Sequence, residues 1–107
     1  MHRTLLVKAE RGEFEITEFD CDPEFGPVPP HIHEDHTDSF YVLEGQLEIT
    51  IGDQTVLAGP GTFFAAPSGV THGFRNPGPG RARFLNIHAP GTGFIAGVRE
   101  QYRDKGA

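Results

Sequence analysis

Short apolar segments alternate with turn residues along most of the chain, and this spacing is typical of a β-rich protein. Aromatic and β-branched residues concentrate in residues 39–43. In the next segment an alternating pattern places Leu47, Ile49 and Ile51 on one side of an extended chain. The pattern predicts an edge strand at 3–7, further strands at 13–19, 39–43, 46–51, 55–57, 62–66, 72–75 and 81–89, and a short C-terminal helix within 94–103.

Glycine and proline set the limits of these elements. The 14 glycines and 9 prolines make up about 21 % of the 107 residues, against roughly 12 % in average proteins. This density excludes a bundle of long helices, and the absence of a Gly-x-y repeat excludes collagen. Residues 22–30 hold four prolines, so we expect a stiff extended connection there. The sequence therefore predicts one all-β domain over residues 1–107, either a sandwich or a barrel.

The histidines are placed as metal ligands often are. His31 and His33 flank Ile32, so on a strand both imidazoles project from one face. Asp38 leads into the next predicted strand, and His72 begins a later one. Two histidines at a spacing of two, a carboxylate and a distant third histidine are a donor set suited to one divalent metal ion. The alternative from spacing alone is a pair of surface histidines without a ligand.

The turn residues around these histidines give the pattern a family resemblance. Gly26, His31, His33, Asp38 and Gly45 resemble the first motif of the cupin family, G-x5-H-x-H-x3,4-E-x6-G. The second cupin motif matches at every defined position, which are Gly61, Pro67, Gly69, His72 and Asn76. The resemblance implies a jelly-roll barrel, or double-stranded β-helix, with both motifs contributing to one site. It also implies one divalent transition metal (iron, manganese, nickel, zinc or copper) held by His31, His33, Asp38 and His72.

The sequence departs from the family pattern at two places. Four residues instead of five separate Gly26 from His31, and Asp38 stands where glutamate is usual. Because aspartate is one methylene shorter, the ligand set could also be three histidines with water. Glu34 and His36 are alternatives to Asp38, although we interpret both as solvated loop residues.

Aromatic residues on the predicted strands suggest a pocket beside the metal, although we expect ordinary core packing for most of these rings. Phe84, Asn86 and His88 share one face of the segment 81–89, so His88 is a candidate for acid–base catalysis or for supporting a ligand. Its alternative is a surface histidine at a strand end. Such a pocket would favour an apolar or aromatic small molecule. The expected lining consists of Phe40, Phe64, Phe74, Phe84 and Asn86.

Charge bears on partners and location. The net charge is −6, but residues 1–53 hold 13 acids and 3 bases whereas residues 54–107 hold 2 acids and 6 bases. A net acidic chain without a basic stripe argues against nucleic-acid binding. We interpret the acidic half as a solvated face, with complementarity between two subunits as the alternative. No segment has the pattern of a signal peptide or a spanning helix, and Cys21 is the sole cysteine, which favours a cytoplasmic protein.

Two classes of function fit these observations. The first is a metal-dependent cupin enzyme, with dioxygenase-type oxidation as the favoured reaction and a metal-dependent isomerase or epimerase as the rival. The second is a non-catalytic protein that holds a metal or small ligand in the barrel. The predicted edge strand at 3–7 could pair across a two-fold axis, so we also expect a homodimer.

Overall fold

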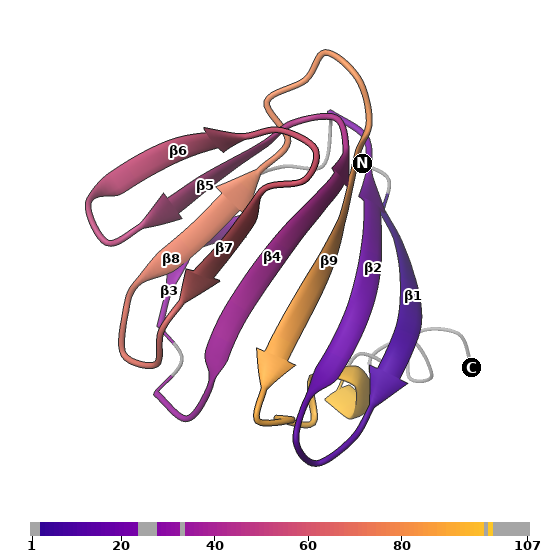
Figure 1. The fold of residues 1–107 in the computed structure, drawn as a ribbon, viewed down its shortest axis with the longest axis vertical. Helices are drawn as coiled ribbons and strands as arrows, with labels where there is room; N and C mark the ends of the chain where they lie inside the picture. Colours follow the sequence, from indigo (N-terminus) through magenta and orange to yellow (C-terminus); the bar gives the residue numbers. More distant parts are fainter. Residues whose placement is uncertain (1–2, 24–27, 33, 98, 100–107) are drawn as a thin grey trace.

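A computed structural model describes residues 3–23, 28–32, 34–97 and 99. The predicted positions Gly26 and His33, and most of the segment 98–103, lie outside these residues. The described residues form nine strands in two facing antiparallel sheets (Figure 1). The strands are β1 (Arg3–Glu10), β2 (Glu15–Cys21), β3 (Val28–His31), β4 (Thr37–Glu44), β5 (Leu47–Ile51), β6 (Gln54–Ala58), β7 (Phe63–Ala66), β8 (His72–Arg75) and β9 (Ala82–Ala89).

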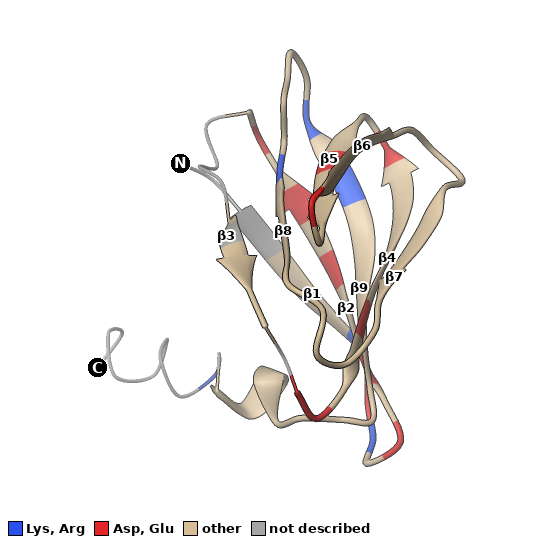
Figure 2. Cartoon of the chain, turned by 90° about the vertical axis from the view of Figure 1, so that its left-hand side faces the viewer, with Lys and Arg blue, Asp and Glu red and all other residues tan. Residues whose placement is uncertain are grey.

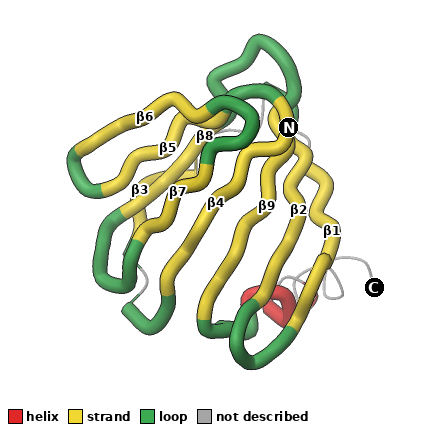
Figure 3. The backbone as a smooth tube through the Cα atoms, viewed as in Figure 1, coloured by secondary structure: helices red, strands yellow, loops and turns green. Residues whose placement is uncertain are grey.

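The strand order brings distant parts of the chain together. The five-stranded sheet runs β1-β2-β9-β4-β7 and the four-stranded sheet runs β3-β8-β5-β6. β1 is an edge strand, as predicted. The expected all-β jelly roll is confirmed, and the described helix is confined to residues 94–97 and 99, beside the end of β9 (Figure 3). No helix in the described part of the chain has the length and hydropathy of a membrane-spanning segment.

A core of aromatic and aliphatic side chains lies between the sheets. Phe19 and Phe84 stack with ring centroids 5.1 Å apart, and Phe40 meets Phe74 edge-on at 5.5 Å. Burying a phenylalanine, leucine or isoleucine side chain contributes about 1.5–3 kcal/mol relative to leaving it exposed. Strand alternation explains the layer, because every second residue of β9 is buried. The core members are Phe19, Cys21, Phe40, Val42, Leu47, Ile49, Ala58 and Phe84.

Pro29 and Pro30 do not prevent strand pairing. We expected an irregular connection there, but the structure assigns β3 across Val28–His31. β3 lies at the edge of its sheet and pairs only with β8 among the described strands. An edge position tolerates proline because one side of the strand needs no backbone donor. The register sets His31 opposite His72.

Ion pairs within the chain join the acidic first half of the sequence to the basic second half. Arg75 pairs with Glu48 at 2.7 Å, and Arg81 pairs with Asp20 at 2.8 Å. Arg83 lies 3.2 Å from Glu18, and Arg99 lies 2.7 Å from Glu10. Each of these four described arginines of the second half therefore meets an acid of the first half. Figure 2 marks where basic and acidic residues lie along the chain. These pairs involve four of the thirteen acids of residues 1–53, and exposed acids such as Glu13, Asp35 and Glu44 fit the solvated face that we expected.

Two motif glycines sit at turns that require positive φ angles. Gly45 has φ +74°, and a Cβ atom placed there would lie 2.2 Å from the carbonyl oxygen of Arg81. Gly61 has φ +85°, with open space around the same position. Residues with a side chain disfavour both conformations. At Gly45 the neighbouring backbone also leaves no room for a Cβ atom, whereas at Gly61 there is room.

Candidate metal centre

The candidate site joins the two sheets through Asp38. β4 projects the buried Asp38 side chain inward, opposite His88 of β9 in the same sheet. His31 and His72 are opposite one another on β3 and β8 of the other sheet. Strand pairing therefore brings together three of the residues that the sequence predicted as ligands. The fourth, His33, lies outside the described residues.

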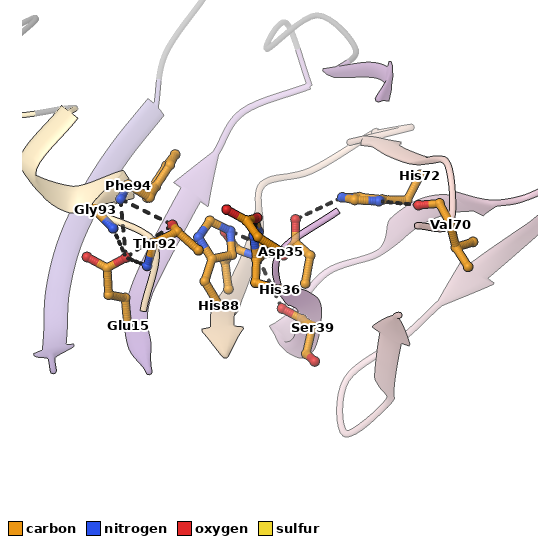
Figure 4. Close-up of polar contacts among 12 residues, drawn as sticks. Glu15, Asp35, His36, Ser39, Val70, His72, His88, Thr92, Gly93 and Phe94 are labelled. Carbon is orange, nitrogen blue, oxygen red and sulfur yellow. Dashed lines mark hydrogen bonds and ion pairs between the residues drawn. The ribbon is translucent and has the colours of Figure 1, made fainter. Parts of the chain in front are cut away.

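His72 is held at both ring nitrogens. Its Nδ1–H donates to the carbonyl oxygen of Val70 at 3.0 Å (Figure 4). Its Nε2 lies 2.9 Å from Oδ2 of Asp38. Burial lowers the pKa of His72, but the hydrogen bonds to Asp38 and Val70 outweigh burial and raise it. The hydrogen bond between His72 and Asp38 therefore favours the charged form of each side chain. The Val70 bond fixes the tautomer that directs Nε2 toward a metal ion.

Asp38 is an ionised carboxylate despite its burial. Burial by itself raises the pKa of Asp38, but hydrogen bonds from His72, His88 and Asn86, with the charge of His88, lower it well below its usual range. Nδ2 of Asn86 donates to Oδ1 of Asp38 and to the backbone oxygen of Ser39. An anionic carboxylate held in place by hydrogen bonds is the form that a cation requires.

The donor set fits a divalent transition metal. One donor atom each from His31, Asp38 and His72 lies within 4.8 Å of the others. Donors bound to a common ion at about 2.1 Å are at most about 4.2 Å apart, so small side-chain adjustments suffice to bring them together. The rings of His31 and His72 already lie with centroids 4.4 Å apart. Two imidazoles with one carboxylate suit iron, manganese, nickel, zinc or copper.

The structure corrects our interpretation of His36. We expected a solvated loop residue, but His36 is 5 % exposed and lies near Asp38 and His88. Its Nδ1–H donates to Oδ1 of Asp35 at 2.7 Å, and its ring centroid lies 4.8 Å from that of His88 (Figure 4). The two-residue spacing between His36 and Asp38, which places both on one face of an extended chain, was the available signal. Glu34 is exposed, as expected.

A cavity of about 190 Å³ opens beside these groups. Of the predicted pocket residues, Phe74 and Asn86 line it, whereas Phe40 and Phe84 are core residues and Phe64 packs partly against the core. His88 faces it too, with Nε2 3.4 Å from Oδ1 of Asp38. The full described lining is Phe19, Val28, His31, Asp38, Phe74, Asn86, His88 and Phe94.

Phe94 reaches the cavity because its helix is fastened to β2. Oε1 of the buried Glu15 accepts hydrogen bonds from the backbone N–H groups of Thr92, Gly93 and Phe94 at 2.8–3.2 Å (Figure 4). Phe94 then meets His88 edge-on, with ring centroids 4.9 Å apart. No local sequence pattern predicted that Phe94 lines the cavity, because its position depends on a contact between residues almost eighty positions apart.

This combination of a two-sheet jelly roll with histidines and a carboxylate between the sheets defines a cupin. The sequence model of the family described as the cupin domain matches residues 12–88, so the chain belongs to this family. It is 32 % identical over 76 residues to quercetin 2,3-dioxygenase of Bacillus subtilis (strain 168), which covers 70 % of this chain and 22 % of that protein. It is 38 % identical over 79 residues to germin-like protein subfamily 2 member 2 of Arabidopsis thaliana, which covers 66 % of this chain and 36 % of that protein.

A solved structure agrees on the fold. The protein TT1209 from Thermus thermophilus superposes with a TM-score of 0.77 at 26 % identity, over 84 % of this chain and 85 % of that one. The two curated relatives are much longer than the matched region, since the chain spans about a fifth of one and a third of the other. Family membership therefore rests on the shared domain.

Proposed function

We propose that the chain binds one divalent transition metal through His31, Asp38 and His72, with His33 as a further ligand. The observation that carries this proposal is the geometry of His72. Its Nδ1–H is held by Val70, and its Nε2 faces the Asp38 carboxylate at 2.9 Å. A histidine anchored in this way through its second nitrogen is typical of metal ligands. The ionised state of Asp38 supplies the negative charge that favours a cation.

The bound ion would supply Lewis acidity and, in the case of a redox-active metal, electron transfer with O₂. The chain's own residues would bind and orient the substrate. Phe19, Phe74 and Phe94 present apolar rings to the cavity and exclude water from it. Asn86 fixes the carboxylate through its side-chain amide. In a site with a single ion, His88 is placed to accept or return a proton at the substrate.

The substrate class follows from the size and lining of the cavity. A cavity of about 150 Å³ lined by apolar side chains holds benzene, so about 190 Å³ accommodates a molecule with a single ring. The favoured reaction is dioxygenase-type oxidation of such a small apolar or aromatic molecule. The similarity to quercetin 2,3-dioxygenase supports this reaction class, although it covers only 22 % of that protein. The alternatives are a metal-dependent isomerase or epimerase and a non-catalytic metal- or ligand-binding cupin.

Metal content tests the first part of the proposal. We expect purified protein to take up zinc or iron after treatment with a chelator, and the His31→Gln and His72→Gln variants to take up less. Asp53→Asn, at an exposed turn, is the matched control and should bind as the wild type does. The metal proposal is overturned if elemental analysis finds no uptake by the wild-type protein, or unchanged uptake by both histidine variants.

Oxygen consumption tests the reaction class. The Fe(II)-loaded protein is assayed with single-ring phenols, catechols and small diketones, with the His72→Gln variant as the blank. Substrate-dependent oxygen uptake supports an oxidase or dioxygenase. Saturable ligand binding without turnover, for every metal tried, favours the non-catalytic alternative instead. Interconversion of isomers without oxygen uptake favours the isomerase.

The outer face of the five-stranded sheet supports the expected homodimer. Strand register aligns Leu6, Leu85, Tyr41 and Phe63 in one row across this face, interrupted by Glu18. Leu6 is 48 % exposed and Phe63 is 57 % exposed. Apolar side chains gathered on one sheet face are typical of a surface that another protein covers. Sedimentation at micromolar concentration should give twice the chain mass, and a Phe63→Glu variant should shift toward the monomer; a monomeric wild type overturns this proposal.

A cytoplasmic location is also part of the proposal. Cys21 is buried in the core and is the sole cysteine of the sequence, which fits a compartment where thiols stay reduced. Fractionation of the cells that produce the protein tests it, and recovery from an extracytoplasmic fraction contradicts it.

A further inference from the structure

A second group of metal donors lies on the other side of Asp38. One donor atom each from His36, Asp38 and His88 lies within 4.8 Å of the others, and all three residues are buried. The four ligand positions that the family resemblance implies include neither His36 nor His88, and the sequence offered His36 only as a replacement for Asp38. The group shares only Asp38 with the site proposed above.

The two groups use different oxygens of the shared carboxylate. Oδ2 of Asp38 lies 2.9 Å from Nε2 of His72, and Oδ1 lies 3.4 Å from Nε2 of His88. The carboxylate of Asp38 can therefore contribute one oxygen atom to each group of donors at the same time. Carboxylates bridge paired ions in this manner in centres whose ions are about 3.5–4 Å apart.

A hydrogen bond at Nδ1 orients the ring of His36, as it does the ring of His72. Nδ1–H of His36 donates to the carboxylate of Asp35 at 2.7 Å, just as Nδ1–H of His72 donates to the carbonyl of Val70. In each ring this bond assigns the proton to Nδ1 and makes Nε2 the atom that can bind a metal. Asp35 is 83 % exposed, so its carboxylate remains charged and adds negative potential near the second group.

We infer that His36, Asp38 and His88 form a second position for a divalent transition ion, bridged by Asp38 to the first. This inference rests on the proposed function only in that Asp38 is common to both positions. Because two dications repel one another at short range, the second ion binds more weakly than the first. When it is bound, His88 serves as a ligand and is no longer available for proton transfer.

Zinc titration of the chelator-treated protein tests the inference. The variants are His36→Gln and His88→Gln in the second group, with His31→Gln in the first. Asp35→Asn is the mild variant, because its exposed side chain can change without disturbing the core. Asp53→Asn is the control for surface carboxylates. Calorimetry counts the bound ions, and circular dichroism shows whether each variant is folded.

Two equivalents of zinc in the wild type, with only the weaker one lost in His36→Gln and His88→Gln, support the inference. Asp35→Asn should then weaken the second equivalent by about 10-fold while leaving the first unchanged. One equivalent that is lost in His31→Gln and kept in His36→Gln overturns the second position but supports the proposed function. One equivalent lost in His36→Gln and kept in His31→Gln overturns both assignments, as does a wild type that binds no zinc. If both glutamine variants of the second group are unfolded, an unchanged titration of Asp35→Asn overturns the inference.

Discussion

Asp38 and His72 connect the two sheets of the barrel through buried side chains whose Oδ2 and Nε2 atoms lie 2.9 Å apart. Asp38 belongs to β4 of the five-stranded sheet, and His72 begins β8 of the four-stranded sheet. The contact therefore holds the two sheets together in the metal-free protein, and under the proposed function the same two side chains would bind the metal. A substitution that keeps the shape but removes the charge separates these two roles.

Asp38→Asn should lower both metal affinity and stability. The amide keeps the volume of the carboxylate but offers a metal no negative charge, so we expect zinc affinity to fall by about 100-fold. Loss of the charged hydrogen bond to His72 should lower the free energy of unfolding by about 1–3 kcal/mol. Urea denaturation in the presence of a chelator measures the second effect, and zinc titration measures the first. Wild-type zinc affinity in this variant would show that Asp38 is not a ligand.

Asp38→Glu restores the usual residue of the family motif, yet it should not improve the site. Asp38 is 4 % exposed and already reaches His72, so an added methylene must displace packed neighbours. Overpacking of this kind costs about 1–3 kcal/mol. We expect a less stable variant with zinc affinity no higher than that of the wild type. Tighter binding with unchanged stability would mean that aspartate is too short for the metal.

The positions of the strands and turns could be predicted because they depend on residues that are close together in the sequence. Apolar alternation marked Leu47 and Ile49 as core residues, and both are fully buried. The turn positions Gly45 and Gly61 adopt positive φ angles that glycine alone reaches easily. Each of these features is decided within a few residues of sequence.

The burial of His36 and the inward face of β2 depend on distant partners instead. His36 follows two acidic residues, so its neighbours in sequence indicate solvent, while strand pairing places it against His88. In β2 the buried side includes Glu15 and Thr17, whereas Ile16 faces outward opposite Ile87. Glu15 is buried because the backbone at 92–94 supplies its hydrogen-bond donors. The local sequence pattern could not predict these contacts, because the partners are far apart along the chain.

Glu15→Gln should destabilise the protein in a pH-dependent way. Burial raises the pKa of Glu15, but hydrogen bonds from the backbone of residues 92–95 outweigh burial and lower it. A lowered pKa means that the stabilisation is complete above the ordinary glutamate pKa of about 4.5 and is lost as the pH falls through the lower value of the folded state. We expect the variant to be less stable by about 1–2 kcal/mol at pH 7, with a smaller difference at acidic pH.

Urea denaturation at pH 7 and below pH 4 measures this difference. Glu13→Gln is the matched control, because Glu13 is exposed on the same hairpin and should behave as the wild type at both pH values. An equal loss of stability for Glu15→Gln at both pH values would show that the charge of Glu15 contributes nothing.

Gly45→Ala and Gly61→Ala form a matched pair that separates backbone strain from steric exclusion. Both glycines have positive φ angles, so alanine costs about 1–2 kcal/mol at either position. At Gly45 the new methyl group would also meet the carbonyl oxygen of Arg81, whereas at Gly61 the space is open. We therefore expect Gly45→Ala to lose at least about 2 kcal/mol more than Gly61→Ala. Thermal denaturation of both variants measures this, and equal losses would contradict the close approach of Gly45 to the backbone that precedes β9.

Removal of the metal should lower the melting temperature of the wild type more than that of a ligand variant. An ion at about 100 times its dissociation constant stabilises the folded state by about 2.7 kcal/mol, which in a domain of this size corresponds to roughly 10 °C. We expect this shift between zinc and chelator for the wild type and a much smaller one for His31→Ala, whose fold should persist because His31 is only half-buried. Magnesium serves as the control ion, since it prefers oxygen ligands and should give no shift. An equal rise with zinc in His31→Ala would place the stabilising ion elsewhere on the chain and contradict the site between β3 and β8.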